Sequence, residues 1–308
     1  MPILINGQRV DDALVDAEFS NIKAYHESLG NVSCCERDPE FRATARQNIV
    51  ARVLLAQEAA RAVEPTPDPD VDAALEKLKE DYGGEQWFMA RTGVTAETLP
   101  LVRRDLDIDL RVRRLVGRLT DDEPAPGEED LRRYYREHLG QFMTDEEVRA
   151  SHVLKGGSGD NRLEGYENLR KVRKELLAGA DFDTLAKAHS DKADDSIDLG
   201  FFKRNELTPE FESVAFSMEV GEVSPIFTSS YGYHLIKLTD RKPSVARPFD
   251  EVRGEVEQRW REDLRGEKTR QLVERLRTGA RIEDIDPDAE AAEIMGASSE
   301  AAVEQSAT

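Results

Sequence analysis

Apolar residues recur at three- and four-residue steps through most of the first 145 residues, which predicts helices. Before them, Ile3-Leu4-Ile5 followed by Asn6-Gly7 predicts a strand that enters a turn. The clearest helix begins at Asp38-Pro39, because proline is favoured at the first helical position, and alternating prolines end it near residue 63. The predicted helices span about residues 12–29, 38–63, 70–82, 85–92, 99–119 and 128–142.

The pattern changes from Glu147 onward. Residues 148–154 alternate between apolar and polar positions, which indicates a strand, and residues 233–238 form a second such segment. Helical patterns lie between them over about residues 162–178 and 181–189. Helices and strands mixed within one such stretch predict a compact α+β domain.

A long helix is predicted after Pro248, with one apolar face that needs a partner. The residues of this face are Val252, Val256, Trp260, Leu264, Leu272 and Leu276. We expect the face to pack on the helical N-terminal region, and residues 280–282 to add a strand beside residues 3–5. The acidic segment that follows, residues 283–308, has the composition of a disordered tail.

The composition excludes several classes of function. The 308 residues carry a net charge of −20, which argues against binding to nucleic acid or to an anionic membrane surface. No apolar run reaches the length of roughly 18–20 residues that spans a bilayer. The first residues lack the pattern of a secretory signal, so we expect a cytoplasmic protein, or an exported one from which a signal has been removed.

The two cysteines, Cys34 and Cys35, are adjacent in the sequence. Adjacent cysteines bridge only with strain, so they do not form a disulfide framework, and no metal-ligand spacing accompanies them. Nucleophile-elbow and phosphate-loop motifs are absent as well. The sequence therefore predicts neither a metal nor another cofactor.

A series of short motifs between residues 147 and 242 resembles the parvulin family (PpiC-like) of peptidyl-prolyl isomerases. Each motif is weak alone, but their order and approximate spacing follow the family. The motifs are Ala150-Ser151-His152-Val153-Leu154, Gly179-Ala180-Asp181-Phe182, His189-Ser190-Asp191, Asp198-Leu199-Gly200-Phe201-Phe202, Leu207-x-Pro209-Glu210-Phe211-Glu212, Gly221-Glu222-Val223-Ser224-Pro225 and Gly232-Tyr233-His234-Leu235-Ile236.

The resemblance implies a four-stranded antiparallel sheet with flanking helices that interconverts cis and trans X–Pro bonds. Rotation about the amide bond has a barrier of about 18–20 kcal/mol because of C–N conjugation. No bond is made or broken, so no cofactor is required. An apolar, dry pocket would favour the twisted amide over the more polar planar one.

The resemblance also implies roles for individual residues. Leu199, Leu207 and Phe211 should line the proline pocket. His152 and His234 should lie close together on neighbouring strands, with either a catalytic part or a tuning effect on the hydrogen bonds of the pocket. Thr228 should form a hydrogen bond with this histidine pair.

One position departs from the family pattern. The family usually has Cys or Asp just after its Ser-Asp or Ser-Glu motif, where this sequence has Lys192. Asp191 or Asp194 could take the place of that polar group; if neither does, activity would be low and the domain would serve as a peptide-binding module. The loop after the first strand offers only Lys155 and Arg162, so no phosphate on the substrate is required.

Asn6-Gly7 followed by helices, and then residues 48–59, are similar to the opening module of the SurA-like chaperone-isomerases, which implies a cradle for unfolded client proteins. Three short motifs are similar to the nitrogenase-maturation isomerases (NifM-like), namely Tyr134-Tyr135, Gln141-Phe142-Met143 and His189-Ser190. We therefore predict a helical chaperone-like module over residues 1–125, a linker helix over 126–145 and the isomerase domain over 146–242. A C-terminal helix over 243–282 packs back on the module. The expected function is a foldase for proline-containing unfolded or nascent clients; the alternative is a holdase with weak catalysis.

Overall fold

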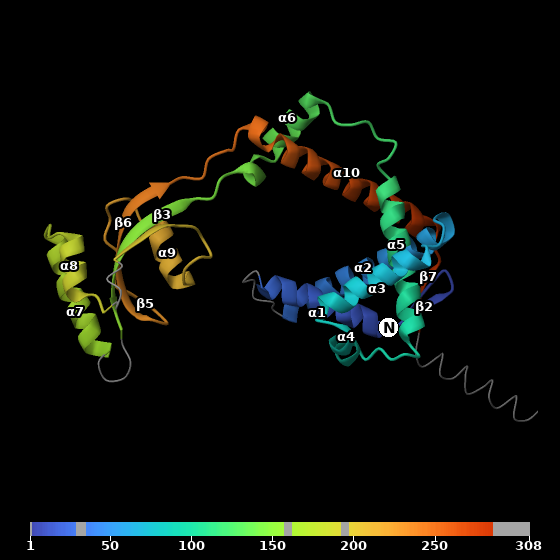
Figure 1. The fold of residues 1–308 in the computed structure, drawn as a ribbon, viewed down its shortest axis with the longest axis horizontal. Coiled ribbons are helices and arrows are strands. Elements are labelled where there is room, and N and C mark those ends of the chain that lie inside the picture. The colour runs from blue at the N-terminus through green and yellow to red at the C-terminus, as the bar shows by residue number, and fades with distance from the viewer. Residues whose placement is uncertain (1, 29–34, 157–161, 192–196, 286–308) are drawn as a thin grey trace, which may run out of the picture. The chain divides into compact units, whose positions relative to one another are not determined.

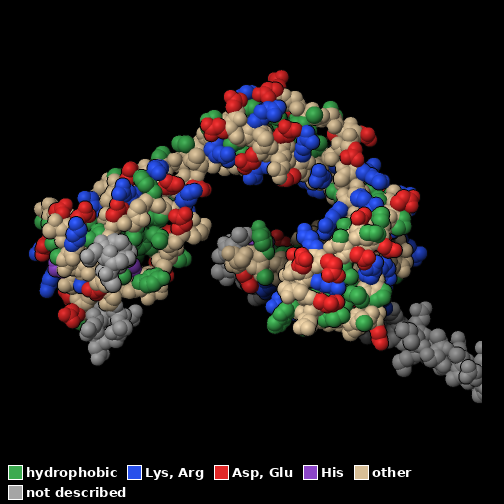
Figure 2. All heavy atoms as spheres, in the orientation of Figure 1, with side chains coloured by type: hydrophobic (Ala, Val, Ile, Leu, Met, Phe, Trp, Pro, Cys, Tyr) green, Lys and Arg blue, Asp and Glu red, His purple; other side chains and the backbone are tan. Residues whose placement is uncertain are grey.

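The computed structural model describes residues 2–28, 35–156, 162–191 and 197–285. These residues divide into two compact units. The first comprises residues 1–125 together with residues from 259 onward, and the second comprises residues 126–258. No helix among the described residues is both long and apolar enough to cross a membrane. On the face drawn in Figure 2, acidic and basic side chains are intermixed over both units.

The first unit combines helices with a small sheet (Figure 1). Its helices are α1 (Asp12–Ser28), α2 (Asp38–Ala62), α3 (Asp68–Asp81), α4 (Glu85–Thr92), α5 (Leu99–Arg118) and the C-terminal part of α10 (Phe249–Gly279), with a 3-10 turn, η1, at Cys35–Arg37. Its strands are β1 (Ile3–Ile5), β2 (Gln8–Val10) and β7 (Ile282–Asp284), in the antiparallel order β2-β1-β7. The helices lie within a few residues of the predicted ones.

The predicted turn after the first strand forms a hairpin. Asn6 and Gly7 both have positive φ, at 50° and 84°, which is the backbone conformation that tight two-residue hairpin turns require. The hairpin brings β2 beside β1 with Ile3 opposite Val10. Strand β2 was not predicted, because its three residues are too few to show an alternating pattern.

The C-terminal strand confirms one expectation and corrects another. Ile5 pairs with Ile282, so the returning chain lies beside β1 as predicted. However, Glu283 and Asp284 belong to β7, and Asp284 forms an ion pair with Arg46 at 2.5 Å. The assignment of a disordered tail from residue 283 is therefore wrong for these residues, since backbone pairing with β1 outweighs their acidic composition. Residues 286–308 lie outside the described part of the chain.

A buried apolar cluster joins the sheet to the helices of the first unit. Ile3 and Ile5 of β1 pack with Ala45 and Ile49 of α2. Residues that follow or end α10 pack against the same cluster, namely Leu276, Ala280 and Ile282. The apolar face predicted for the long helix is thus used in this part of its length.

The second unit contains the predicted α+β domain, together with the predicted linker helix and the start of α10. Among the described residues, its strands form a four-stranded antiparallel sheet in the order β4-β3-β6-β5. The strands are β3 (Glu147–Lys155), β4 (Asp198–Phe202), β5 (Phe227–Ser229) and β6 (Gly232–Lys242). The helices are α6 (Glu128–Glu137), α7 (Arg162–Leu177), α8 (Phe182–His189), α9 (Pro209–Ser217) and the start of α10. The helix predicted over 128–142 ends at Glu137, and a 3-10 turn, η2 (Leu139–Phe142), follows it.

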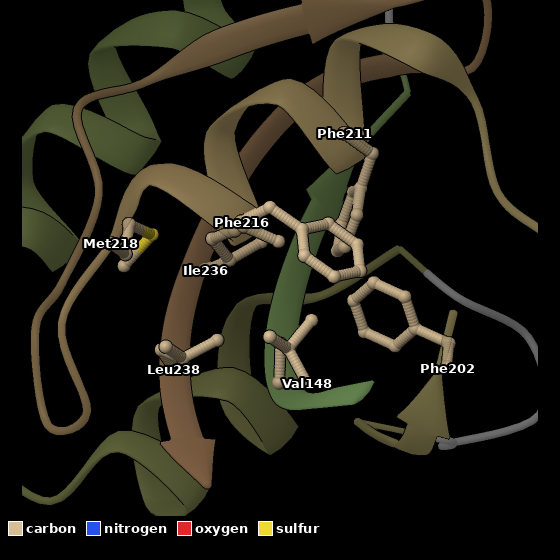
Figure 3. Close-up of a cluster of buried hydrophobic side chains, with 9 residues drawn as sticks. Val148, Phe202, Phe211, Phe216, Met218, Ile236 and Leu238 are labelled. Atoms are coloured by element: carbon tan, nitrogen blue, oxygen red, sulfur yellow. The ribbon is translucent and has the colours of Figure 1, made fainter. Parts of the chain in front are cut away.

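Helices cover both faces of this sheet (Figure 1). Helix α9 packs on one face, where Phe211 and Phe216 contact a cluster that includes Ile236 of β6. Figure 3 shows these side chains gathered between α9 and the strands. Helices α7 and α8 pack on the other face, over Leu235 of β6. Because side chains alternate along a strand, every second residue of β6 faces α9, including His234.

Candidate functional site

An apolar groove opens on the face of the sheet that α9 covers, with a cavity volume of about 270 Å³. Eight of the residues that the structure describes line it, and none of them is Asp, Glu, Lys or Arg: His152, Leu154, Leu199, Leu207, Thr208, Phe211, Tyr231 and His234. The groove therefore brings together Leu199, Leu207 and Phe211, the three residues predicted for a proline pocket, with both predicted histidines.

The two histidines come from paired strands. His152 of β3 lies opposite Ile236 of β6, so His234 is its diagonal neighbour on the same face of the sheet. Their ring centroids are 6.2 Å apart, with an angle of 29° between the ring planes. Both side chains are buried. The expected pair on neighbouring strands is thus present and lies against the groove.

Phe211 is the centre of an aromatic cluster. Its ring meets the rings of Phe227 and His234 edge-on, each at a centroid distance of 5.7 Å, and that of His152 at 6.1 Å. Phe227 in turn stacks on His234 at 5.2 Å. Edge-on and stacked aromatic pairs each favour a defined geometry. The phenyl wall of the groove and the histidine pair are therefore fixed relative to one another.

The hydrogen bond predicted from Thr228 is made by its neighbour. The Oγ atom of Ser229 lies 2.7 Å from Nε2 of His234, whereas Thr228 is exposed. The cause is the alternation of side chains along β5: Phe227 pairs with His234, so Phe227 and Ser229 share the groove side and Thr228 points to the other. The prediction for Thr228 was therefore wrong by one residue.

Asp191 lies at the end of β3. Its carboxylate accepts hydrogen bonds from Nζ of Lys155, at 2.5 Å, and from the backbone N–H of Gly156, at 3.2 Å. It is not among the described residues that line the groove. Lys192 and Asp194, the other candidates for the polar group beside the substrate carbonyl, lie outside the described residues.

Comparison with known proteins assigns the second unit to a family. Residues 126–254 match the family model of the PPIC-type PPIase domain. These residues form a parvulin-type peptidyl-prolyl isomerase domain. The motifs that indicated this family are thereby confirmed, and the domain catalyses cis-trans isomerisation of X–Pro bonds.

Similarity extends beyond the isomerase domain. The foldase protein PrsA of Caldanaerobacter subterraneus is 29% identical over 292 residues, which are 91% of this chain and 85% of that protein. The foldase protein PrsA of Halalkalibacterium halodurans is 32% identical over 252 residues, 75% of this chain and 65% of that protein. A solved structure from a study of SurA-like chaperones of Campylobacter jejuni is 14% identical, covers 93% of this chain and 99% of its own, and has a TM-score of 0.42.

Three residues of the isomerase groove were not predicted from the sequence: Leu154, Thr208 and Tyr231. Leu154 follows His152 by two positions on β3, so the period of a strand places both on one face. Tyr231 precedes β6, and its backbone N–H donates to Oγ of Ser229 at 3.1 Å. Tyr231 is 67% exposed, so it borders the groove on the solvent side.

The hydrogen bond from Ser229 predicts an effect on isomerase activity that Thr228 does not share. Replacement of Ser229 by alanine should lower kcat/KM about ten-fold, because the ring of His234 loses the hydroxyl that orients it. Replacement of Thr228 by valine also removes one hydroxyl, but on the opposite face of β5, and should leave kcat/KM unchanged. A protease-free assay on an X–Pro peptide measures both, and equal effects would contradict the assignment to Ser229.

Burial keeps His234 in its neutral form. It lowers the pKa of the imidazole below the ordinary value of 6.5, and the charge of Glu210 offsets this only in part. The Nδ1 atom of His234 has no hydrogen-bond partner among the described residues. The imidazole is therefore uncharged at neutral pH and contributes to an apolar groove.

The lowered pKa of His234 predicts how the stability of the isomerase domain depends on pH. Protonation favours the unfolded chain, because its histidine has the higher pKa. The neutral ring therefore contributes fully to the free energy of unfolding above about pH 6.5, and this contribution is lost as the pH falls through the pKa of His234 in the folded protein. We expect the difference in free energy of unfolding between the wild type and His234→Gln to be smaller at about pH 5.5 than at about pH 7.5. Urea unfolding at the two pH values measures it; a difference that does not change with pH would contradict the prediction.

Proposed function

We propose that the protein is a foldase whose isomerase groove accelerates X–Pro isomerisation in unfolded client proteins. The observation that carries the proposal is that Leu199, Leu207 and Phe211 meet the two histidines around one apolar groove. The relatives reported above, which match most of this chain, bear the name foldase, and this supports a client that is a folding protein rather than a finished one.

The groove can favour rotation without covalent chemistry. We propose that the proline ring lies against Leu199, Leu207 and Phe211, which exclude water from the amide. A planar amide is more polar than a twisted one, so loss of water raises the free energy of the planar state more than that of the twisted transition state. Uncatalysed isomerisation takes tens to hundreds of seconds, so even a moderate reduction of the barrier matters for a folding chain.

Two roles of the histidine pair in isomerisation are compatible with the groove. In the first, a neutral His152 or His234 interacts directly with the rotating amide. In the second, the pair fixes Phe211 and the hydrogen bond to Ser229, and so tunes the groove. The contacts of Phe211 with both rings favour the second part. The catalytic role predicted for Asp191 stays a prediction; the contacts with Lys155 and Gly156 support a positional role beside Leu154.

We propose that clients need no phosphate before proline. Lys155, the last residue of β3, forms an ion pair with Asp191. A phosphate would have to compete with this carboxylate for the ammonium group. The net charge of −20 supports a protein client rather than nucleic acid.

One pair of assays separates the foldase from its alternative, a holdase with weak catalysis. The full chain should accelerate isomerisation of a short X–Pro peptide and the refolding of a protein whose slow phase is proline isomerisation. A chain that suppresses aggregation of an unfolded client but accelerates neither reaction would be the holdase. That outcome would also give weight to Lys192 as the residue that lowers activity.

Two further predictions concern the setting of this function. The location in the cell stays a prediction, and fractionation of the source cells with an antibody to the chain separates the cytoplasmic from the exported alternative. A dedicated role in nitrogenase maturation also stays a prediction, and deletion of the gene followed by growth on dinitrogen tests it.

A further inference from the structure

Glu212 of α9 has a carboxylate in an unusual place. The residue is only 8% exposed, and carboxylates are almost never buried unless they are paired. It follows Phe211 directly in the sequence, yet its side chain is absent from the groove lining among the described residues. Its charge therefore needs partners outside the groove.

The partners are three consecutive backbone N–H groups. Oε2 of Glu212 accepts from the N–H of Asn205 at 2.9 Å, and Oε1 accepts from those of Glu206 and Leu207, both at 2.8 Å. Asn205 has a φ of 70°, a left-handed conformation that helps to turn successive N–H groups toward one anion.

The electrostatics agree with this geometry. Burial alone would raise the pKa of Glu212, but the hydrogen bonds from Asn205, Leu207 and Glu206, with the charge of Arg204, hold the pKa below its ordinary value. The carboxylate is therefore ionised while it binds the loop.

The loop that Glu212 holds is a wall of the isomerase groove. It connects β4, which ends at Phe202, with α9, which begins at Pro209. Leu207 and Thr208 of this loop line the groove. Because they belong to neither strand nor helix, the backbone hydrogen bonds of the sheet do not fix their positions. Phe211 lines the groove from α9. Glu212 thus joins the helix that carries one apolar residue of the groove to the loop that carries another.

We propose that Glu212 is a positioning residue of the isomerase site, which sets the place of Leu207 relative to Phe211 through the three hydrogen bonds to the loop. This inference rests on the proposed function of the groove. Glu212 does not touch the substrate; it acts through Leu207. A group that is misplaced by about 1 Å in an enzyme site can lower the rate about 100-fold, so the hydrogen bonds that place Leu207 are expected to affect activity strongly.

The first test compares Glu212→Gln with a matched control, Glu222→Gln. The glutamine keeps the shape of Glu212 but turns an NH₂ group toward donor N–H groups. Glu222 accepts one backbone N–H, that of Glu219, in an exposed turn away from the groove. We expect Glu212→Gln to lower kcat/KM on an X–Pro peptide about ten-fold and Glu222→Gln to leave it unchanged. Unchanged kcat/KM in a folded Glu212→Gln variant would overturn the proposal.

The second test asks whether Glu212 acts through Leu207. Two residues that act as one unit give effects that do not add. If the proposal holds, Glu212→Gln should have less than about a two-fold effect on kcat/KM in a Leu207→Ala background. A full ten-fold loss in that background would show a general effect on the fold and would overturn the proposal.

A more conservative variant keeps the test decisive if Glu212→Gln does not fold. Glu212→Asp retains the charge, but its carboxylate is one methylene shorter and reaches all three N–H groups only if the loop moves. We expect a loss in kcat/KM of about three-fold that again disappears in the Leu207→Ala background. An activity equal to that of the wild type would overturn the proposal. If the wild-type chain itself gives no acceleration, the proposed function fails, and this is seen before any variant is measured.

Discussion

Replacement of Phe211 by alanine is expected to lower the free energy of unfolding of the isomerase domain by about 3–5 kcal/mol and kcat/KM by at least about 100-fold. The ring is 4% exposed and belongs to the cluster between α9 and the sheet, so its loss leaves a cavity. It also lines the groove and contacts His152 and His234, so the same change opens the site to water.

Phe216→Ala is the matched control for this prediction. Phe216 lies on the same helix, belongs to the same buried cluster and is 7% exposed, but it is not among the described residues that line the groove. We expect a similar loss of stability. At a temperature where both variants are folded, kcat/KM should fall less than about three-fold for Phe216→Ala.

Urea unfolding and a peptide assay on the same preparations measure both quantities. Equal losses of kcat/KM in the two variants would mean that activity follows the stability of the domain and not the groove. Unchanged activity in Phe211→Ala would remove the central residue of the proposed site.

The sequence was informative where local pattern and family motif agree. Helix α4 has the predicted bounds, because its ends are marked by glycines at positions 84 and 93. His152, Leu207 and Phe211 lie in motifs with fixed spacing, so their meeting in one groove could be predicted. The long helix α10 could be predicted from its apolar repeat and the prolines before it.

Other features depend on contacts that no local pattern records. The hydrogen bond to His234, which Ser229 makes in place of Thr228, is an example. In a strand, a shift of one residue moves a side chain to the opposite face. The extension of β7 to Glu283 and Asp284 was missed, because their pairing with Leu4 and Ile3 of β1 outweighs their acidic composition. Tyr231 borders the groove only because β5 and β6 join there, and Glu212 could not be assigned before its loop was placed.

These cases share a physical cause. The groove is built from β3, β6, the start of β4, a loop and α9, and its geometry depends on the pairing register between strands. A sequence motif fixes which residues take part, whereas backbone contacts fix which way they face. A backbone contact at one end of the groove should therefore affect both the stability of the domain and its activity.

Gly232→Ala is expected to destabilise the isomerase domain by more than the strain of its backbone alone. Gly232 has a φ of 135°, and a Cβ at this position would lie 2.3 Å from the carbonyl oxygen of Lys155 and 3.0 Å from Cα of Gly156. The added methyl group must force β6 away from the end of β3. Because Leu154, Tyr231 and His234 lie at this end, the groove should widen, and kcat/KM should fall together with stability.

Gly221→Ala separates the effect of backbone strain from that of the steric clash of the added Cβ atom. Gly221 also has positive φ, at 92°, but a Cβ there would meet nothing within 4 Å. The strain of such a conformation costs about 1–3 kcal/mol, and we expect this loss of stability in Gly221→Ala with kcat/KM unchanged. Gly232→Ala should lose at least about 2 kcal/mol more, since a backbone carbonyl cannot give way as a flexible side chain can. Urea unfolding and the peptide assay measure the two variants side by side. Equal losses in the free energy of unfolding would mean that β3 and β6 can move apart at Gly232 with no further loss of stability. The geometry of the groove would then not depend on this contact.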